Sequence, residues 1–248
     1  MLAEQRFEII LQELEEHRAA GVPRLCELTG ASEATIRRDL NALARQGKLS
    51  KVHGGVVACG GAFLGEEPDV GTKERMHQPE KECIARYAAE LISDEDVVYL
   101  DAGTTTVRMV EHLKHSKATF VTNGVACALR LLELGLQGYV LGGALKPGTG
   151  AVVGAQALTD LESYNFTKAF LGTNGITLRQ GYTTPDPEEA AVKRKASQRA
   201  YLTYILADSS KFETVSAASV LPLEKASIIT DHLPDRAYLE HTIVKEVL

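Results

Sequence analysis

Residues suited to binding a polar ligand stand where five short apolar runs in the second half of the chain end. Each run is followed at once by glycine, threonine, asparagine, aspartate or lysine, whose amide, hydroxyl, carboxylate and ammonium groups can form hydrogen bonds with a ligand. The groups cover residues 101–106, 122–124, 142–143, 172–175 and 208–211. We therefore predict that these positions together bind a small polar molecule.

The first group, Asp-Ala-Gly-Thr-Thr-Thr at 101–106, has the composition of a phosphate-binding turn. Gly103 permits a sharp bend, and the three threonines after it open a predicted helix whose free N–H groups suit an anion. A tight turn capped by threonines for structural reasons alone would read the same, so both interpretations stay open. The residues expected around a phosphate and its polyol are Asp101, Gly103, Thr104, Thr105, Thr106, Asn123, Gly143, Asn174 and Lys211.

A loop and helix at 181–195, with the sequence GYTTPDPEEAAVKRK, add Asp186, Glu189 and Lys193 to the candidate residues. Glu189 and Lys193 are four residues apart on one helical face, in the order that favours a surface ion pair of about 0.3–0.5 kcal/mol. Alternatively the same face looks into the ligand site. In that case Glu189 would accept hydrogen bonds from sugar hydroxyls, and Lys193 would supply positive charge.

A second kind of chemistry, the reading of DNA, is indicated by residues 32–43, SEATIRRDLNAL. Ser32 is a natural N-cap, and Ile36, Leu40 and Leu43 recur at the spacing of one buried helical face. The opposite face carries groups that can bond to phosphates or base edges, although surface arginines on an ordinary helical bundle would show the same periodicity. The residues expected to contact DNA from this helix are Ser32, Ala34, Thr35, Arg37 and Arg38.

The flanking segments favour a helix-turn-helix followed by a wing. Residues 22–29 form a second short amphipathic helix, Gly30-Ala31 supplies the turn, and residues 48–57 (KLSKVHGGVV) predict a glycine-turned hairpin. Segment 32–57 has five Lys or Arg residues against two acids in a chain of net charge −6, so DNA affinity would come from a focused basic patch. Lys48, Lys51 and His53 are placed to touch backbone phosphates.

Periodicity places these residues in two domains. Amphipathic helices are predicted at 3–17 and 80–91, and apolar strands at 97–100, 118–121, 138–141, 168–171, 204–207 and 227–230 alternate with helices at 105–115, 125–134 and 187–200. This alternation predicts a parallel sheet covered on both faces, with its ligand at the carboxyl ends of the strands. The predicted division is a DNA-binding domain at 1–58, a linker at 59–78 and a ligand-binding domain at 79–248.

Length and composition limit the remaining possibilities. A chain of 248 residues that is 44% hydrophobic and 24% charged suits a folded protein with one small and one medium domain. Cys26, Cys59, Cys83 and Cys127 lack the spacing of metal ligands, so no metal site is predicted. The absence of a signal peptide and of a run of eighteen apolar residues predicts a cytoplasmic protein that does not enter a membrane.

Over nearly its whole length the chain resembles the DeoR family of bacterial transcriptional regulators. The matching stretches are ASEATIRRDLNAL and KVHGGV, then LDAGTTT, TNG, LGG, GYTTPD with EAAVK, and LADSSKF, in the family's order. The resemblance implies an α/β architecture: an N-terminal winged helix-turn-helix and a C-terminal Rossmann-like α/β sensor domain resembling ribose-5-phosphate isomerase. It also implies a phosphate loop at 101–106 and a polar shell that includes Thr184 and Asp186. One departure is Thr167, where the family usually has aspartate.

For function, the resemblance implies a repressor of a carbohydrate-utilisation operon that a phosphorylated sugar releases from double-stranded operator DNA. The 181–193 stretch looks most like that of family members that regulate fructose use, so fructose 1-phosphate is the expected effector, with no cofactor. Because helix-turn-helix proteins commonly bind DNA as dimers, we expect a homodimer or homotetramer.

The competing interpretation is an active sugar-phosphate isomerase with a DNA-binding appendage. Glu189 or Asp186 would then act as the base, and Lys211 or Lys193 would stabilise an enediolate. A sensor that consumes its ligand loses its signal, so the sequence favours the regulator.

Overall fold

The computed structural model describes residues 1–45, 48–58, 62–63 and 69–247, and it divides into two compact units, Met1–Ala62 and Phe63–Leu248. Of the predicted linker at 59–78, residues 59–61 and 64–68 lie outside the described residues. The later part of that segment contains a short helix, α4 (Val70–Arg75), which the sequence pattern did not indicate.

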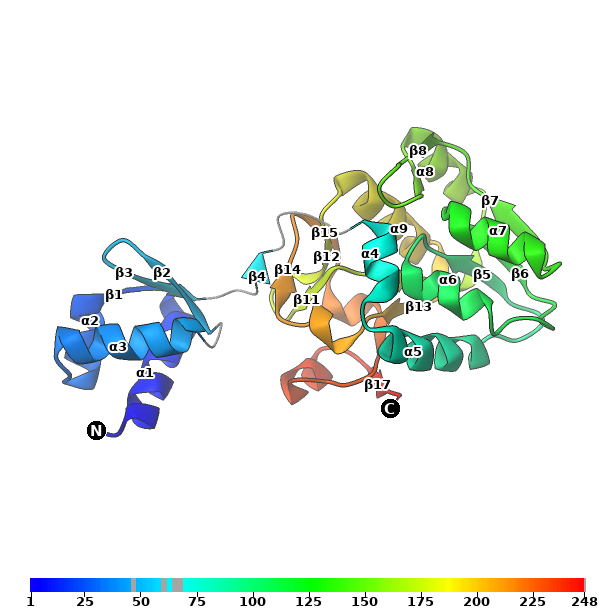
Figure 1. Cartoon of the computed structure of the whole chain (residues 1–248). Coiled ribbons are helices and arrows are strands. Elements are labelled where there is room, and N and C mark those ends of the chain that lie inside the picture. The colour runs from blue at the N-terminus through cyan, green and yellow to red at the C-terminus, as the bar shows by residue number, and fades with distance from the viewer. Residues whose placement is uncertain (46–47, 59–61, 64–68, 248) are drawn as a thin grey trace. The chain divides into compact units, whose positions relative to one another are not determined.

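The first unit is a three-helix head with a small antiparallel sheet (Figure 1). Its elements are α1 (Ala3–His17), β1 (Ala19–Gly21), α2 (Val22–Thr29), α3 (Glu33–Arg45), β2 (Leu49–Val52) and β3 (Gly55–Ala58), and the strand order is β1-β3-β2. The predicted apolar positions Ile36, Leu40 and Leu43 of α3 are buried in its core with Ile10 and Leu14 of α1. Burial of one face of each helix therefore fixes which face of α3 remains exposed.

Three glycines shape the head, two of them in turns and one where two strands approach closely. Gly30 ends α2 in the left-handed conformation, with φ of 65°, and its N–H donates to the Cys26 carbonyl at 2.8 Å. Gly54 takes a φ of 82° in the hairpin turn between β2 and β3, as expected for a glycine turn. Gly55 serves a different purpose, because a Cβ there would stand 2.4 Å from the Ala20 carbonyl oxygen of β1. The pairing of β3 with β1, a strand that the sequence did not predict, therefore requires glycine at position 55.

The second unit is built on a seven-stranded sheet in which neighbouring strands run parallel. Its strands are β5 (Val97–Leu100), β6 (Thr119–Thr122), β7 (Gly138–Val140), β10 (Phe166–Gly172), β13 (Ala200–Leu206), β16 (Ser227–Thr230) and β17 (Val244–Glu246). The order is β17-β16-β13-β10-β5-β6-β7, so the chain builds outward from β5 to β7 and then returns to the other side of β5 at β10. The adjacent ends of β5 and β10 form the topological switch point at which such sheets bind ligands.

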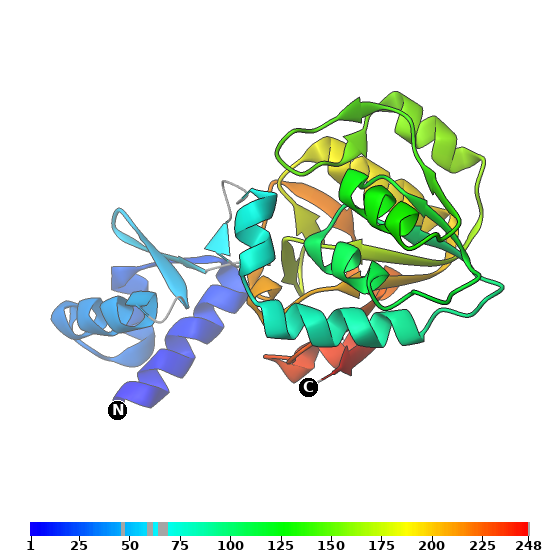
Figure 2. The ribbon, with the colours of Figure 1, turned by 45° about the vertical axis from the view of Figure 1, so that its right-hand side comes forward.

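Helices cover both faces of this sheet, as the two views in Figures 1 and 2 show. One core joins Val98, Leu100 and Phe120 to α5 (Gln78–Glu90), α6 (Thr104–Val110) and α7 (Val125–Glu133). The other joins Tyr99 and Val121, from the alternate positions of the same strands, to α8 (Ala155–Glu162) and α9 (Pro187–Gln198). The strands are apolar on both sides because both sides are covered, as predicted.

Smaller elements complete the second unit. They are β8 (Ala144–Leu145) paired with β9 (Val152–Val153), a sheet of β11 (Gly175–Thr177), β12 (Gly181–Thr184) and β15 (Ala218–Leu221), the short strands β4 (Ala62–Phe63) and β14 (Thr214–Val215), and the single-turn helices Ser209–Lys211, Leu223–Lys225 and Arg236–Glu240. Among the described residues, every helix is too short or too polar to span a lipid bilayer.

Candidate functional site

The outer face of α3 is exposed and carries the residues predicted to contact DNA. Ser32 caps the helix: its side-chain oxygen accepts from the Thr35 N–H at 3.3 Å, and its carbonyl accepts from the Ile36 N–H at 2.9 Å. Arg37 and Arg38 point away from the core, and the Arg37 side chain, 68% exposed, lies 3.3 Å from Glu33. Such an exposed pair is weak enough for a phosphate or a base edge to displace it.

The acidic residue of α3 that could oppose DNA is neutralised inside the head. Asp39 is buried, and its two carboxylate oxygens accept from Arg6 of α1 at 2.6 and 3.1 Å. This two-point ion pair clamps α1 to α3, and it removes one of the two acids counted in segment 32–57. The exposed charge around α3 is therefore more positive than the sequence count suggested.

The hairpin after α3 holds further cationic side chains. Lys51 of β2 donates to the Asn41 side chain at 2.7 Å, which ties the hairpin to α3. Lys48 and His53 are exposed at the start and the turn of the hairpin. The eight residues predicted to contact DNA thus lie at or on one helix and on the hairpin next to it. Ser32, Ala34, Thr35, Arg37 and Arg38 belong to the helix and its cap, and Lys48, Lys51 and His53 belong to the hairpin.

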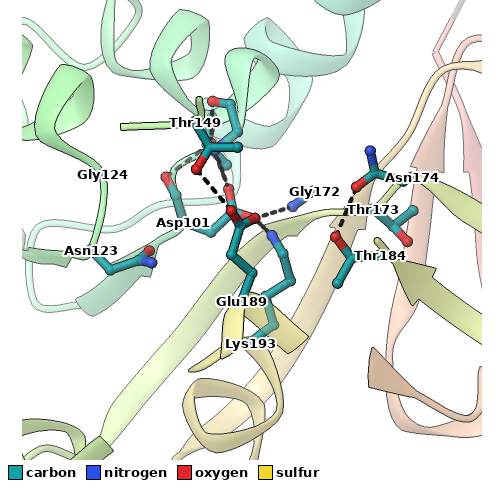
Figure 3. A network of polar contacts seen from close by, with 12 residues as sticks. Asp101, Asn123, Gly124, Thr149, Gly172, Thr173, Asn174, Thr184, Glu189 and Lys193 are labelled. Atoms are coloured by element: carbon teal, nitrogen blue, oxygen red, sulfur yellow. Dashed lines mark hydrogen bonds and ion pairs between the residues drawn. The ribbon is translucent and has the colours of Figure 1, made fainter. Parts of the chain in front are cut away.

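A separate cavity lies at the switch point of the second unit, where Figure 3 shows polar side chains converging from several elements. Of the predicted effector residues it is lined by Gly103, Thr104, Thr105, Asn123, Asn174, Glu189, Lys193 and Lys211. Gly103 is the N-cap of α6 and has no side chain to cap it, so the first N–H groups of this helix lack a side-chain cap at a point where Gly103, Thr104 and Thr105 line the cavity.

Asp101 lies beneath the cavity rather than in its lining, and its carboxylate organises the floor (Figure 3). One oxygen accepts from the Gly103 N–H at 2.8 Å and from the Thr106 hydroxyl at 2.7 Å, and the other accepts from the Gly172 N–H at 2.6 Å and from the Lys193 ammonium. Burial would raise the pKa of Asp101, but the Lys193 charge and these hydrogen bonds lower it below 3.8. The carboxylate therefore joins β5, α6, β10 and α9 and has its acceptor positions filled from within the protein.

The same close approach explains why residue 103 is glycine. A Cβ at Gly103 would lie 2.9 Å from the nearer Asp101 oxygen and 3.2 Å from the Thr106 hydroxyl. A larger residue would thus push apart the hydrogen bonds that shape the floor.

Two further polar residues connect the cavity wall. The Asn123 side chain accepts from the Tyr99 hydroxyl at 2.8 Å and donates to the Val152 carbonyl at 3.0 Å. Glu189 accepts from the Thr149 hydroxyl at 2.8 Å, which ties the loop between β8 and β9 to α9. Glu189 and Lys193 are both buried, so the alternative of an exposed surface ion pair is wrong for these residues.

Besides Asp101, four of the predicted effector residues do not line the cavity. Thr106 is fully buried under the floor, and Thr184 reaches the site only through its hydrogen bond to the Asn174 side chain at 2.9 Å. Asp186 caps α9 by accepting from the Glu188 and Glu189 N–H groups at 2.9 Å each, and it pairs with Lys146. Gly143 belongs to the β8–β9 hairpin, where a Cβ would meet the Val153 carbonyl at 2.4 Å.

The structure adds cavity residues that the sequence interpretation missed, chiefly Lys73 of α4, Lys81 of α5 and Thr149, and Asp208 of the predicted 208–211 group also lines the cavity. Lys81 is 4% exposed. Its position three residues before Ile84 and seven before Ala88 is in phase with the apolar stripe of its helix, and that phase was the available signal. The cavity is therefore more cationic than predicted, because Lys73, Lys81, Lys193 and Lys211 all line it.

Comparison with known proteins assigns both units. The model of the DeoR-like helix-turn-helix domain matches residues 6–60, and that of the DeoR C terminal sensor domain matches residues 76–232. Together with the parallel sheet, these matches confirm the predicted α/β fold class with a helix-turn-helix at its N-terminal end.

Whole-length relatives agree. The chain is 41% identical over 251 residues to a Bacillus subtilis protein named "Uncharacterized HTH-type transcriptional regulator FruR", covering 100% of this chain and 99% of the relative. It is 33% identical to the "HTH-type transcriptional repressor GlcR" of the same species, covering 97% and 93%. It is also 33% identical to a "Putative aga operon transcriptional repressor" of Escherichia coli O157:H7, covering 91% and 84%.

Two solved structures show distant likeness. Ribose 5-phosphate isomerase A from Methanocaldococcus jannaschii aligns with a TM-score of 0.42 and 14% identity over 54% of each chain. The eIF2B beta protein from Chaetomium thermophilum aligns with a TM-score of 0.44 and 14% identity over 66% of this chain and 54% of that one.

Proposed function

Because the chain belongs to the DeoR family of transcriptional regulators, we propose that it represses a carbohydrate-utilisation operon and leaves its operator when a phosphorylated sugar binds. DNA binding and a C-terminal sensor domain are family properties of this chain. The repressing direction, the phosphorylated sugar and a cytoplasmic location are the proposal.

The observation that carries the effector proposal is the composition of the switch-point cavity. Uncapped N–H groups at the start of α6 and four lysines offer a site for a phosphate, since each such anion needs several donors. Glu189 and Asn174, which also line the cavity, offer acceptors and donors for sugar hydroxyls. Fructose 1-phosphate is our specific candidate, because the 181–193 stretch resembles that of regulators of fructose use, and no cofactor enters the proposal.

The mechanism requires the two sites to be thermodynamically coupled. A homodimer would present two copies of α3 to half-sites about 34 Å apart, or a multiple of that spacing, along the DNA. Effector binding would favour a state that fits this spacing poorly. Typical coupling of about 1–3 kcal/mol would weaken operator binding about 5–150-fold, which is enough to switch transcription.

A direct experiment is a thermal-shift screen of the wild type against fructose 1-phosphate, fructose 6-phosphate, glycerol 3-phosphate and tagatose phosphates. A ligand at 100 times its dissociation constant adds about 2.7 kcal/mol of stability, which is readily measured. Thr104→Ala and Lys211→Ala, which change the cavity lining, should leave operator binding intact and abolish the response to effector. Normal induction in both variants would show that the effector binds elsewhere.

Two of the four groups considered for the isomerase alternative are engaged in internal contacts, whereas Glu189 and Lys211 line the cavity. Asp186 is occupied in capping α9 and pairing with Lys146, and Lys193 is paired with the buried Asp101 carboxylate. Relatives of the chain are named transcriptional regulators, and the chain is a regulator rather than an enzyme. Incubation with aldose and ketose phosphates should therefore show no interconversion.

A further inference from the structure

Helix α4 is the first helix of the second unit in chain order, so the covalent path from α3 to the sheet of the sensor passes through it. None of its residues is buried, so it gains little from burial of apolar surface. Its N-terminal end is capped by Asp69, which accepts from the Thr72 N–H and hydroxyl at 2.9 Å each. At its other end the support comes from a different helix.

That support is the Lys81 ammonium of α5. It donates to the Lys73 carbonyl, which also accepts from the Met76 N–H, and at 2.8 Å to the Met76 carbonyl, where α4 ends. An ammonium group has three N–H donors, so one more acceptor can bind to it. Because Lys81 also lines the effector cavity, that acceptor can be an anion in the cavity.

Charges around Lys81 favour an added anion. Lys73 and Lys211 line the same cavity, and Asp208 is the acid that faces Lys81 there. Burial, and then the neighbouring cations Lys211, Arg108 and Lys73, lower the pKa of Lys81, while Asp208 raises it. An ammonium in such surroundings is stabilised when a phosphate brings negative charge next to it.

The N-terminal end of α4 faces the other side of the site. Asp69 lines a hollow with Lys146, Thr149, Asp186 and Glu189, and Thr149 and Glu189 also line the main cavity. Val70 and Lys73 of α4 line the main cavity as well. The helix therefore lines the cavity through Val70 and Lys73, its C-terminal end is bonded to the cavity residue Lys81, and its cap Asp69 lines the adjoining hollow.

On the premise of the proposed function, we propose that Lys81 binds the effector's phosphate and thereby fixes α4 over the cavity, so that the order of this connecting helix reports whether the effector is bound. Lys73 adds charge to the same phosphate from α4 itself. Without an anion, the lysine that holds the end of α4 lies among Lys73, Lys211 and Arg108, with Asp208 as the opposing acid. With an anion the same lysine joins ligand and helix.

Amide hydrogen exchange of residues 70–76 and operator affinity, both measured with and without saturating fructose 1-phosphate, test this. In the wild type the ligand should slow exchange in this segment and lower operator affinity by about 5–150-fold. In Lys81→Met exchange should be fast in both states, and operator affinity should change less than about twofold, because the helix no longer receives the signal. Lys114→Met, which removes an exposed lysine, is the matched control and should behave as the wild type.

A second variant decides the matter if Lys81→Met does not fold or does not bind the sugar phosphate. Asp69→Ala removes the cap of α4 and leaves every cavity lysine in place, so ligand should still bind, with affinity weakened by up to about fivefold. Its operator response should be reduced. A full response in Asp69→Ala together with unchanged exchange at 70–76 in the wild type would overturn the role of α4.

The two proposals fail in different ways. If no phosphorylated sugar stabilises the wild type in the thermal-shift screen, the proposed function is overturned and this inference with it. If the sugar phosphate binds and releases the wild type from DNA, but Lys81→Met responds equally, only the inference is overturned.

Discussion

Asp101 illustrates how a residue that looks like a ligand contact can instead shape the site. Its place after an apolar strand and before Gly103 suggested contact with a polyol, but it is 1% exposed and bonded to four donors of the protein. Those donors come from the start of α6, from β10 and from α9, and only the folded arrangement brings Gly172 and Lys193 to it. The sequence could indicate the strand end, but not the occupation of the carboxylate.

Removing Lys193 should expose the electrostatic cost of this buried carboxylate. In the wild type the pKa of Asp101 is lowered, so its contribution to stability is present above about pH 3.8 and is lost as pH falls through the lower folded value. In Lys193→Met burial is no longer opposed by the ammonium, and we expect a loss of about 3–5 kcal/mol at pH 7. The loss should shrink as pH falls toward 5 and below, because protonation removes the unpaired charge.

Urea unfolding of both proteins between pH 5 and pH 8 measures this difference. The double variant Asp101→Asn with Lys193→Met has no buried charge at this position, so its difference from the wild type should vary much less with pH over that range. A deficit of Lys193→Met that is the same at every pH would show that lost packing, and not the charge, causes it.

The arginines of α3 should matter for DNA alone. Arg38→Ala is expected to weaken operator binding by about 1–3 kcal/mol if its guanidinium reads a guanine edge, and Arg37→Ala should act similarly after allowance for its weak pair with Glu33. Fluorescence anisotropy with an operator duplex gives the loss. Arg179→Ala, which removes an exposed arginine from the sensor unit, should bind as the wild type. An equal loss of sugar-phosphate affinity in the α3 variants would contradict the division of labour.

At the level of elements, the pattern of apolar residues predicted most of what carries the site. Strands β5 and β16 have the predicted ends, and the cores of β6, β7, β10 and β13 lie within a few residues of the predicted runs. Burial on both faces makes such strands continuously apolar, which is a strong local signal. Strand β10 is longer than predicted because Phe166 and Thr167 precede the predicted run and Gly172 follows it, and Thr167 bonds to the Val97 backbone of β5 at 3.1 and 3.2 Å.

Elements without a buried stripe escaped prediction for a physical reason. Strand β1 is the three residues Ala19–Gly21, and it pairs with β3 through backbone hydrogen bonds that depend on the turn at Gly54. Helix α4 has no buried residue, so no apolar period marks it. Its stabilising partner Lys81 lies on another helix, where a lysine in an apolar phase reads as an exception. The cationic side of the cavity was missed with it.

The hairpin after α3 should contribute to affinity through phosphates and not through sequence. A plot of the logarithm of the binding constant against the logarithm of salt concentration has a negative slope. Lys48→Ala is expected to reduce the magnitude of this slope by about one and to weaken binding to all DNA sequences alike. Lys51→Ala should do more, since Lys51 also ties the hairpin to α3 through Asn41. Titrations in increasing salt with operator and unrelated duplexes supply both slopes. A Lys48→Ala variant that lost operator binding but kept its salt slope would place Lys48 at a base edge instead.

At the scale of the molecule, charge is distributed unevenly. The chain carries a net charge of −6, while Arg37, Arg38, Arg45 and Lys48 are exposed on α3 and its hairpin and Asp39 is neutralised by Arg6. Each unit has its own buried core, with Ile10, Leu25 and Leu43 in the first and Tyr99, Phe120 and Phe170 in the second. An acidic protein with a focused basic surface avoids general binding to polyanions, and separate cores allow one unit to change without unfolding the other.

Because one molecule carries both sites, the coupling between them must be reciprocal. If fructose 1-phosphate lowers operator affinity by a given factor, excess operator must lower fructose 1-phosphate affinity by the same factor, about 5–150-fold for typical coupling. Calorimetric titration of the sugar phosphate into protein alone, into protein with operator duplex and into protein with a scrambled duplex, all at one protein concentration, measures it. The scrambled duplex should leave the sugar-phosphate affinity unchanged. Unequal factors would mean that a further equilibrium, such as a change of oligomeric state, accompanies one titration and not the other. Repeating both titrations over a range of protein concentrations would then reveal that equilibrium, because only an association equilibrium shifts with protein concentration.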